Sequence, residues 1–442
     1  MKALAAFLLL SALPILAADS EISSRVEPQV PGLVATYIDL HQHPELSHHE
    51  ERTSAFLAGE LRKAGYDVTE HVGKYPDGSR GFGVVALLQN GAGPVVLVRT
   101  DMDALPVTEN TGLPYASKVH VKDDAGNEVG VMHACGHDLH MTSFLGTART
   151  LAAMKDRWHG TLMLIGQPAE ERIDGARAML ADDLYTRFPK PDYALALHDD
   201  ATIAAGKVGV TPGPILAGAT SVDVTIRGVG GHGAKPDATK DPIVAAAQYI
   251  LAIQTIVSRQ TSPLDPAVVT VGSIHGGSKH NIIPDEVHLQ LSIRAFDERV
   301  RENILTDLKR TAQGVALAAG IPDDRAPIVA VSDTEVVPAT YNDPALAARV
   351  RTALIAALGK DNVLEPRAVM GSEDFGLFGL EGRQIPIVMM RLGAVAPEKI
   401  ADSERTGKPL PSLHSSLFAP VPEPAIRTGV TAMTAAVIGL MK

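Results

Sequence analysis

Short apolar runs and stretches with helical periodicity alternate along most of this chain of 442 residues. The apolar runs are bounded by Gly, Pro or Asp, as is typical of buried strands, and apolar residues three and four positions apart predict the helices between them. Buried strands that alternate with helices predict an α/β domain with a largely parallel sheet. The strands predicted before residue 200 are 84–88, 95–98, 162–165 and 193–197, and the helices include 30–40 and 142–154.

A helix start is predicted near residue 50 from two polar residues. Ser47 and Glu50 are three positions apart and precede apolar residues with helical spacing, which is the pattern of a capping box. Gly65 ends this helix.

The pattern changes after residue 211, where a β-α-β-β-α-β order begins. That order predicts a ferredoxin-like unit, and roughly 110 residues are enough for a separate domain. The elements are strands 221–227, 267–273, 286–294 and 328–331 and helices 241–257 and 298–319. The α/β pattern then resumes, with helices 344–358 and 423–441 and strand 387–392. We therefore predict a discontinuous catalytic domain, 29–212 and 327–442, with an inserted α+β lid or dimerisation domain at 213–326.

The first residues differ from the rest of the chain. Lys2 precedes an apolar run that ends at Ala17-Ala18, which predicts a signal peptide at 1–18 and a periplasmic or secreted protein. A retained anchor or a buried helix is the alternative interpretation. After signal removal we expect no membrane association.

The formal net charge is −11, with no basic run and few aromatic residues, which argues against a nucleic-acid partner.

Cys135 is the only cysteine, so an intramolecular disulfide is impossible. A single thiol in an oxidising compartment needs protection or a use. His137 lies two positions away, and thiolate and imidazole are good ligands for zinc-like metals. On this spacing alone, a buried cysteine beside ordinary histidines is an equally good interpretation.

Two adjacent carboxylates, Glu170 and Glu171, follow the predicted strand 162–165. Side by side in a dry pocket they would repel each other, whereas a metal would let one act as a ligand and the other handle protons. A solvated acidic loop is the simpler interpretation, but α/β sheets bind ligands at the carboxyl ends of their strands.

Three further segments offer donors. His198 closes a predicted strand and His414 lies near the C-terminus, although a lone His at such a position is more often structural. Asp101 and Asp103 follow strand 95–98 and could be metal ligands, acceptors for the N–H of a ligating His, or turn formers. We favour Asp101 as such an acceptor.

A glycine-rich segment surrounds His232 and formally satisfies a dinucleotide-binding pattern. Pro236 interrupts it where the phosphate-binding helix should begin, so the glycines more plausibly form a tight loop that presents His232. The sequence contains no Gly-x-Ser-x-Gly elbow or Walker loop, which argues against the commonest serine-hydrolase and nucleotide-binding functions.

These segments together resemble the amidohydrolases that include hippurate hydrolases, bacterial N-acyl-amino-acid hydrolases and plant auxin-conjugate hydrolases. This group lies within the aminoacylase and carboxypeptidase superfamily of dinuclear metallopeptidases. The resemblance runs from about His41 to near the C-terminus. It is carried by His133-Ala-Cys-Gly-His-Asp, Gln167-Pro-Ala-Glu-Glu171, Gly230-Gly-His-Gly-Ala234, Asn281-Ile-Ile-Pro-Asp285 and Gly371-Ser-Glu-Asp-Phe375.

The resemblance implies a role for each matching position. Two divalent transition metal ions (Zn, Mn, Co or Ni) are implied, with five ligands: Cys135, His137, Glu171, His198 and His414. Glu170 is implied as the general base, and His232 as a group that reaches the active site of a partner subunit in a homodimer. Asn281 and Arg294 are implied to meet the substrate carboxylate.

The expected reaction is hydrolysis of the amide bond of N-acyl amino acids. A carboxypeptidase or dipeptidase for short peptides is the alternative, and a non-catalytic metal- or peptide-binding relative is a third. Three positions depart from the family pattern and put substrate preference in doubt. They are Asp200-Ala201 after His198, where relatives usually have a proline, Asp237 in place of a second histidine, and Ser416 in place of a proline.

Overall fold

The computed structural model describes residues 21–442, so the predicted signal peptide at 1–18 lies outside the described residues. The chain forms two compact units. The first contains the residues up to Gly213, Asn342–Arg367 and Phe378–Lys442, and the second contains Pro214–Tyr341 and Ala368–Leu377.

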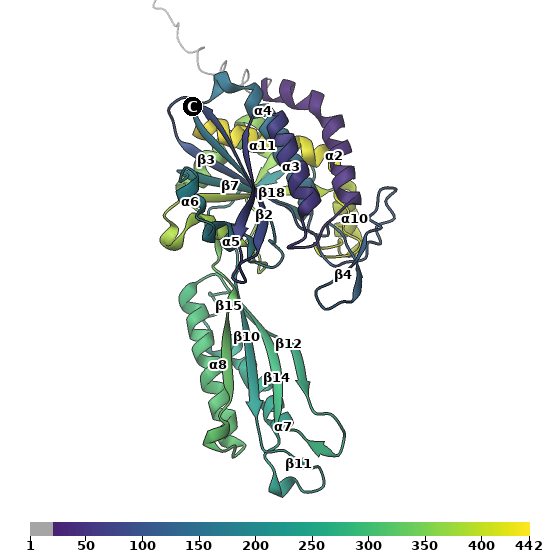
Figure 1. Cartoon of the computed structure of the whole chain (residues 1–442), viewed down its shortest axis with the longest axis vertical. Helices are drawn as coiled ribbons and strands as arrows, with labels where there is room; N and C mark the ends of the chain where they lie inside the picture. The colour runs from purple at the N-terminus through teal and green to yellow at the C-terminus, as the bar shows by residue number, and fades with distance from the viewer. Residues whose placement is uncertain (1–20) are drawn as a thin grey trace, which may run out of the picture. The chain divides into compact units, whose positions relative to one another are not determined.

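The first unit is built on an eight-stranded sheet with the order β1-β2-β6-β3-β7-β18-β8-β17 (Figure 1). Its four central strands, β6, β3, β7 and β18, run parallel, which confirms the predicted α/β class. The strands are β1 (Asp67–Lys74), β2 (Arg80–Asn90), β3 (Val95–Asp101), β6 (Gly160–Gln167), β7 (Tyr193–Ala204), β8 (Val208–Gly209), β17 (Val363–Leu364) and β18 (Ile387–Val395).

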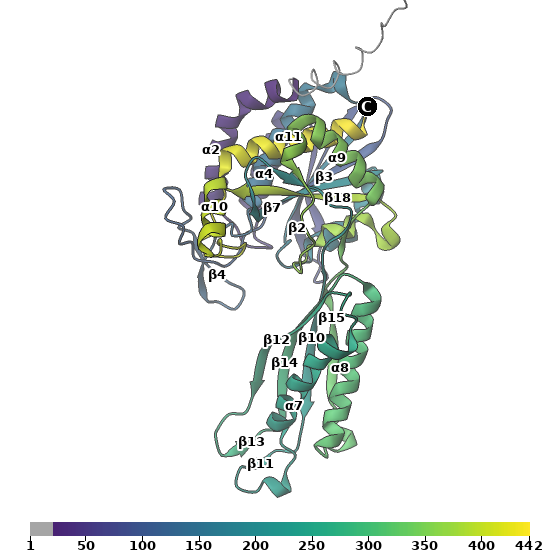
Figure 2. The same ribbon diagram turned by 180° about the vertical axis from the view of Figure 1, so that it is seen from behind.

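Helices pack on this sheet and on one another (Figure 2). Helix α4 packs against β3 and β7, and α11 packs against β18, α4 and α9. Both α4 and α11 are buried over most of their length, because they lie between the sheet and the outer helices. The helices are α2 (Val30–Gln42), α3 (Glu51–Lys63), α4 (His137–Ala153), α5 (Gly175–Ala181), α6 (Leu184–Arg187), α9 (Pro344–Leu358), α10 (Pro397–Thr406) and α11 (Pro422–Leu440).

The register of the central strands places the polar residues that follow them. Strand β3 pairs with β6 so that Asp101 is opposite Gln167, and both strands end there. Strand β7 is longer than predicted, because β18 continues beside it from the Arg391–His198 pair to the Val395–Ala204 pair. His198 therefore lies within a strand and does not close one.

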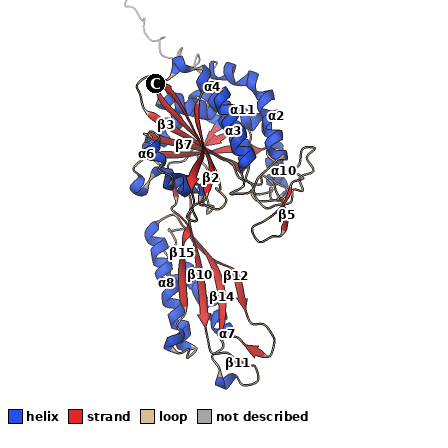
Figure 3. Cartoon of the chain, in the orientation of Figure 1, coloured by secondary structure: helices blue, strands red, loops and turns tan. Residues whose placement is uncertain are grey.

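The second unit contains an antiparallel sheet with the order β12-β14-β10-β15 and two helices (Figure 3). Its chain order confirms the predicted β-α-β-β-α-β unit. The elements are β10 (Gly218–Arg227), α7 (Pro242–Thr255), β12 (Ala267–Gly276), β14 (Glu286–Ala295), α8 (Glu298–Ala318) and β15 (Ile328–Val337). Two short strands, β11 (Gly231–His232) and β13 (Ile282–Ile283), pair at one end of this unit.

Helix α8 shows how local sequence forms this unit. Asp297 caps its start by accepting hydrogen bonds from the backbone N–H groups of Arg299 and Val300. Its buried residues recur every four positions and form one apolar stripe against the sheet. They are Val300, Ile304, Leu308, Ala312 and Ala316.

Two local predictions need correction, and one strand was missed. The insert ends near Tyr341 rather than at residue 326, because β15 pairs with β10 inside its sheet. Ser47 and Glu50 form no capping box: α3 begins at Glu51 without a side-chain cap, and the Ser47 hydroxyl donates to Asp103 at 2.6 Å. Strand β1 was not predicted, because Asp67–Lys74 is mostly polar and forms an edge of the sheet.

Among residues 21–442, no helix is long and apolar enough to span a membrane.

Candidate metal centre

The backbone at Cys135-Gly136-His137 turns sharply where α4 begins. Gly136 has a φ of +75°, and a Cβ on it would lie 2.4 Å from an Asp199 carboxylate oxygen. Any side chain here would be strained and would clash. Glycine therefore lets Cys135 in the preceding loop and His137 in the first turn of the helix face the same pocket.

The two adjacent glutamates lie in the loop that follows β6. Ala169, directly before them, has a φ of +48°, which is unusual for a residue with a side chain. The backbone N–H of Glu171 donates to Asp103 Oδ2 at 3.0 Å. This turn directs Glu170 and Glu171 toward His137, whose Nε2 lies 3.7 Å from Glu170 Oε2 and 3.8 Å from Glu171 Oε1.

The remaining two histidines reach the pocket from distant segments. His198 donates from Nδ1 to the backbone carbonyl of Asp199 at 2.8 Å, which leaves Nε2 facing Cys135 Sγ at 3.7 Å. His414 Nε2 lies 3.3 Å from the same sulfur and 3.5 Å from Glu171 Oε2. The side chain of His414 is 55% exposed, whereas those of His137 and Glu171 are 0% and 9% exposed, so the site opens to solvent beside His414.

The structure thus brings together the five residues predicted as ligands. Their donor atoms form two groups of three within 4.8 Å, Cys135–His137–His198 and Cys135–Glu171–His414, and a third group, His137–Glu170–Glu171, adds Glu170. The Cys135 sulfur belongs to the first two groups, as a ligand shared by two neighbouring ions would.

The electrostatics of the pocket favour cations. Burial works against a charged His137, yet Asp101 and Asp103 outweigh it and raise its pKa to about 10. The same carboxylates would also attract a metal ion. Burial and the nearby Glu171 raise the pKa of the Cys135 thiol well above its usual value, so a thiolate here requires a cation as partner. Sulfur, imidazole and carboxylate donors suit zinc-like divalent ions.

We predicted Asp101 as the acceptor for the N–H of a ligating histidine, but the carboxylate that faces Nδ1 of His137 is that of Asp103. Asp103 Oδ1 lies 3.4 Å from His137 Nδ1, on the side of the ring away from the other donors. Asp101 instead contacts Nδ1 of His140 at 2.7 Å, and the backbone N–H of Asp199 donates to Nε2 of His140 at 2.8 Å. His140, Asp199 and Ser47 were not predicted as parts of the site, and only the position of His140 one helical turn after His137 could have indicated it.

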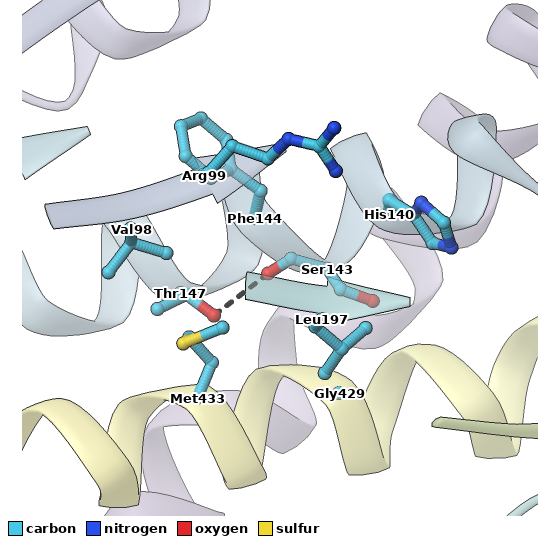
Figure 4. Close-up of a pocket in the computed structure, with 9 residues that line it drawn as sticks. All are labelled: Val98, Arg99, His140, Ser143, Phe144, Thr147, Leu197, Gly429 and Met433. Atoms are coloured by element: carbon cyan, nitrogen blue, oxygen red, sulfur yellow. Dashed lines mark hydrogen bonds between the residues drawn. The ribbon is translucent and has the colours of Figure 1, made fainter. Parts of the chain in front are cut away.

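A small cavity lies behind His140 (Figure 4). It is bordered by Arg99, Ser143, Phe144 and Met433, and the Thr147 hydroxyl donates to the Ser143 carbonyl at 2.9 Å beside it. Its volume of about 10 Å³ holds no more than one water-sized molecule. The cavity is therefore packing space behind the site and cannot bind a substrate.

The predicted substrate-contacting residues all lie in the second unit, at two separate places. His232 in β11 is exposed and pairs with Ile282, and the Gly233 N–H donates to the Asn281 carbonyl at 2.9 Å, so His232 and Asn281 are neighbours. Arg294 lies near the opposite end of β14, where it contacts Ser292 and Ser372. Glu286, which lies near the first pair, and Arg294 are eight positions apart along β14, a span of about 27 Å.

Cys135→Ser tests the shared sulfur. Because serine keeps the shape but is a poor ligand for zinc-like ions, we expect at least one metal ion to bind 10-fold more weakly or worse, on the order of what the loss of a supporting residue costs. Elemental analysis after dialysis and titration against a competing chelator measure this effect. His49→Ala, which changes an exposed imidazole on a neighbouring segment, is the control. Unchanged metal content and affinity would show that Cys135 is not a ligand.

A mixed sulfur, nitrogen and oxygen donor set at the carboxyl ends of an α/β sheet, with an additional glutamate beside it, defines a metal-dependent hydrolase. The chain belongs to peptidase family M20/M25/M40, which it matches over residues 97–406. It is accordingly a hydrolase of amide bonds.

Relatives of known name cover most of the chain. N-acetyl-L-cysteine deacetylase of Bacillus subtilis is 37% identical over 340 residues, which are 77% of this chain and 75% of the relative. Hippurate hydrolase of Campylobacter jejuni is 36% identical over 341 residues, with coverage of 77% and 82%. Thermostable carboxypeptidase 1 of Saccharolobus solfataricus is 36% identical over 342 residues, with coverage of 77% and 80%.

A solved structure supports the same assignment. The YXEP protein of Bacillus subtilis, described as a dinuclear metal-binding peptidase of the M20 family, superposes with a TM-score of 0.72. The sequences are 26% identical, and the superposition covers 95% of this chain and 98% of the other. The donor groups around Cys135 fit a dinuclear centre of this kind.

Proposed function

We propose that this protein hydrolyses N-acyl amino acids to a carboxylic acid and a free amino acid, with Glu170 as the general base. The observation that carries the proposal is the position of Glu170, a carboxylate 3.7 Å from His137 Nε2 and beside the two donor groups that share Cys135. The names of the relatives, a deacetylase and a hippurate hydrolase, support the substrate class.

The residues of the chain account for the proton that moves from the attacking water to the leaving nitrogen. Cys135, His137, Glu171, His198 and His414 would hold two divalent ions. When bound, such ions polarise the scissile carbonyl and lower the pKa of the attacking water. Glu170 takes one proton from that water as the oxygen attacks the carbonyl carbon, and returns it to the leaving nitrogen as the C–N bond breaks.

We propose that the active unit is a homodimer, in which His232 and Asn281 serve the site of the other copy. His232 would donate to the developing oxyanion, and Arg294 would pair with the substrate carboxylate. The separation of about 27 Å along β14 supports this, because one copy cannot bring His232 and Arg294 to the same small substrate.

The surface of the second unit also supports self-association. Strand β12 is an edge strand, paired only with β14, and Ile274 on it is 52% exposed. Helix α7 exposes Val244 and Leu251, the latter to 73%. If β12 and α7 packed against β12 and α7 of a second copy, the edge strand and the exposed apolar residues would both be covered.

We also propose that the protein is exported. The apolar run within 1–18 supports a signal peptide. N-terminal sequencing of the protein from its natural host tests this, with cleavage after about residue 18 as the expected result.

A panel of substrates offered with several divalent metals tests the activity. We expect cleavage of N-benzoyl and N-acetyl amino acids and little cleavage of the same compounds with an amidated carboxyl group, because the amide removes the charge that Arg294 would bind. Carboxypeptidase or dipeptidase activity is the second candidate, favoured by the named carboxypeptidase relative. Rapid cleavage of dipeptides with negligible cleavage of N-acyl amino acids would establish that candidate and exclude the first.

A further inference from the structure

The four residues Ser47-His48-His49-Glu50 lie against the loop that carries Glu170 and Glu171. Two of these residues contact the loop directly. Glu50 Oε1 accepts the backbone N–H of Ala169 at 2.8 Å, and His48 Nε2 contacts the Asp174 carboxylate at 3.1 Å. Ser47 reaches the loop only through Asp103, which accepts both the Ser47 hydroxyl at 2.6 Å and the backbone N–H of Glu171 at 3.0 Å. We call residues 47–50 the clamp.

The contact of Glu50 is the most specific of the three. Ala169 has a φ of +48°, and an alanine leaves this left-handed conformation readily unless its surroundings hold it. Glu50 is fully buried and its Oε1 also accepts the N–H of His48 at 3.1 Å, so one carboxyl oxygen ties the clamp to the strained residue. The residue after Ala169 is Glu170.

We propose that Glu50 is a positioning residue, which holds Ala169 in its left-handed conformation and thereby orients Glu170 toward the scissile amide. This inference rests on the proposed role of Glu170 as the base. It also explains why Ser47 and Glu50, which have the spacing of a capping box, form no cap on α3: Glu50 binds the glutamate loop and Ser47 binds Asp103.

The pKa of Glu50 supports a role that depends on its hydrogen-bonding oxygen and not on a negative charge. Burial and the nearby Asp103 carboxylate raise the pKa of Glu50 to about 8. Glutamine copies the shape of a protonated glutamate and keeps a carbonyl oxygen for the Ala169 N–H. Glu50→Gln should therefore preserve the positioning, whereas Glu50→Ala should remove it.

The expected results separate positioning from folding. Glu50→Ala should lower kcat by about 10²-fold, the order of loss that a displacement of about 1 Å causes, with metal content retained. Glu50→Gln should remain within about 3-fold of the original kcat. Ala169→Gly should restore at least 10-fold of the loss in Glu50→Ala, because glycine adopts the left-handed conformation without a Cβ cost.

Glu45→Ala is the matched control. Glu45 lies five residues before Glu50 and also accepts two backbone N–H groups, those of Arg52 and Thr53 in α3, but neither bond reaches the glutamate loop. Its loss should lower stability and leave kcat within about 3-fold. If Glu50→Ala does not fold, Glu50→Asp, whose shorter side chain withdraws the oxygen from Ala169, gives the same comparison with Glu50→Gln.

Hydrogen–deuterium exchange of peptides that span residues 168–174 supplies a readout that needs no substrate. We expect faster exchange in Glu50→Ala than in the original protein, Glu50→Gln and Glu45→Ala. Unchanged exchange in Glu50→Ala, or an equal loss of kcat in Glu50→Gln, would overturn the inference. Failure of the original protein to cleave any compound of the panel would overturn the proposed function instead, and leave the exchange result as an independent measure of the clamp.

Discussion

Glu170→Ala is expected to lower kcat by about 10²- to 10⁴-fold while the protein keeps its metal, because a general base contributes about this much to hydrolysis. Glu170 lies 3.7 Å from His137 Nε2. The five predicted ligands form two groups of three donor atoms that share Cys135, and neither group includes Glu170. The measurement is kcat at a saturating concentration of an N-acyl amino acid, together with the metal content of the same sample.

Glu171→Ala is the matched control, since it changes the adjacent glutamate in the same loop. Glu171 Oε2 is 3.5 Å from His414 Nε2, and Glu171 is predicted to be a ligand, so this variant should lose metal. Loss of metal in Glu170→Ala would show that Glu170 is a ligand as well. Full activity in that variant would show that another group acts as the base.

His232→Ala is expected to lower kcat by about 10²- to 10³-fold, the usual loss when one oxyanion donor is removed, without loss of metal. Mixing it with Glu170→Ala should restore activity, because a mixed dimer has one site with a native Glu170 from one copy and a native His232 from the other. Random exchange of subunits makes half of the dimers mixed with one intact site each, so about one quarter of the original activity should return.

The control for this experiment is His280→Ala, which changes an exposed histidine of the same unit that lies next to Asn281 and near His232. That variant should remain active by itself. Absence of restored activity in mixed dimers confirmed by native mass spectrometry would mean that each copy forms its site alone, and the dimeric site would then be wrong.

The sequence predicted the architecture because the fold depends on periodicity, which is local. Apolar runs such as 95–98 and 162–165 became the parallel strands β3 and β6, and the order of elements after residue 211 became the ferredoxin-like insert. Prediction failed where local polarity and tertiary position disagree. Strand β1 is mostly polar because it lies at an edge of its sheet, and β15 belongs to the insert only through its pairing with β10.

The sequence by itself also determined which residue types gather in the candidate site. A single cysteine two residues from a histidine, two adjacent glutamates after a buried strand and two further histidines each have an ordinary structural interpretation when taken singly. Together they supply enough donors for a metal centre, and the family resemblance implies which of them are ligands. The structure brings all five predicted ligands within reach of one another.

Only the tertiary structure decided how these side chains are held. Asp103 rather than Asp101 supports His137, and Glu50 holds Ala169 rather than capping α3. Each of these choices depends on which oxygen faces which nitrogen across segments that are 34 residues apart in the first case and 119 in the second. The residue types along the chain indicate which side chains can act as donors. Their directions are set by strand register and by left-handed residues such as Gly136 and Ala169, the second of which is held by contacts from a distant segment.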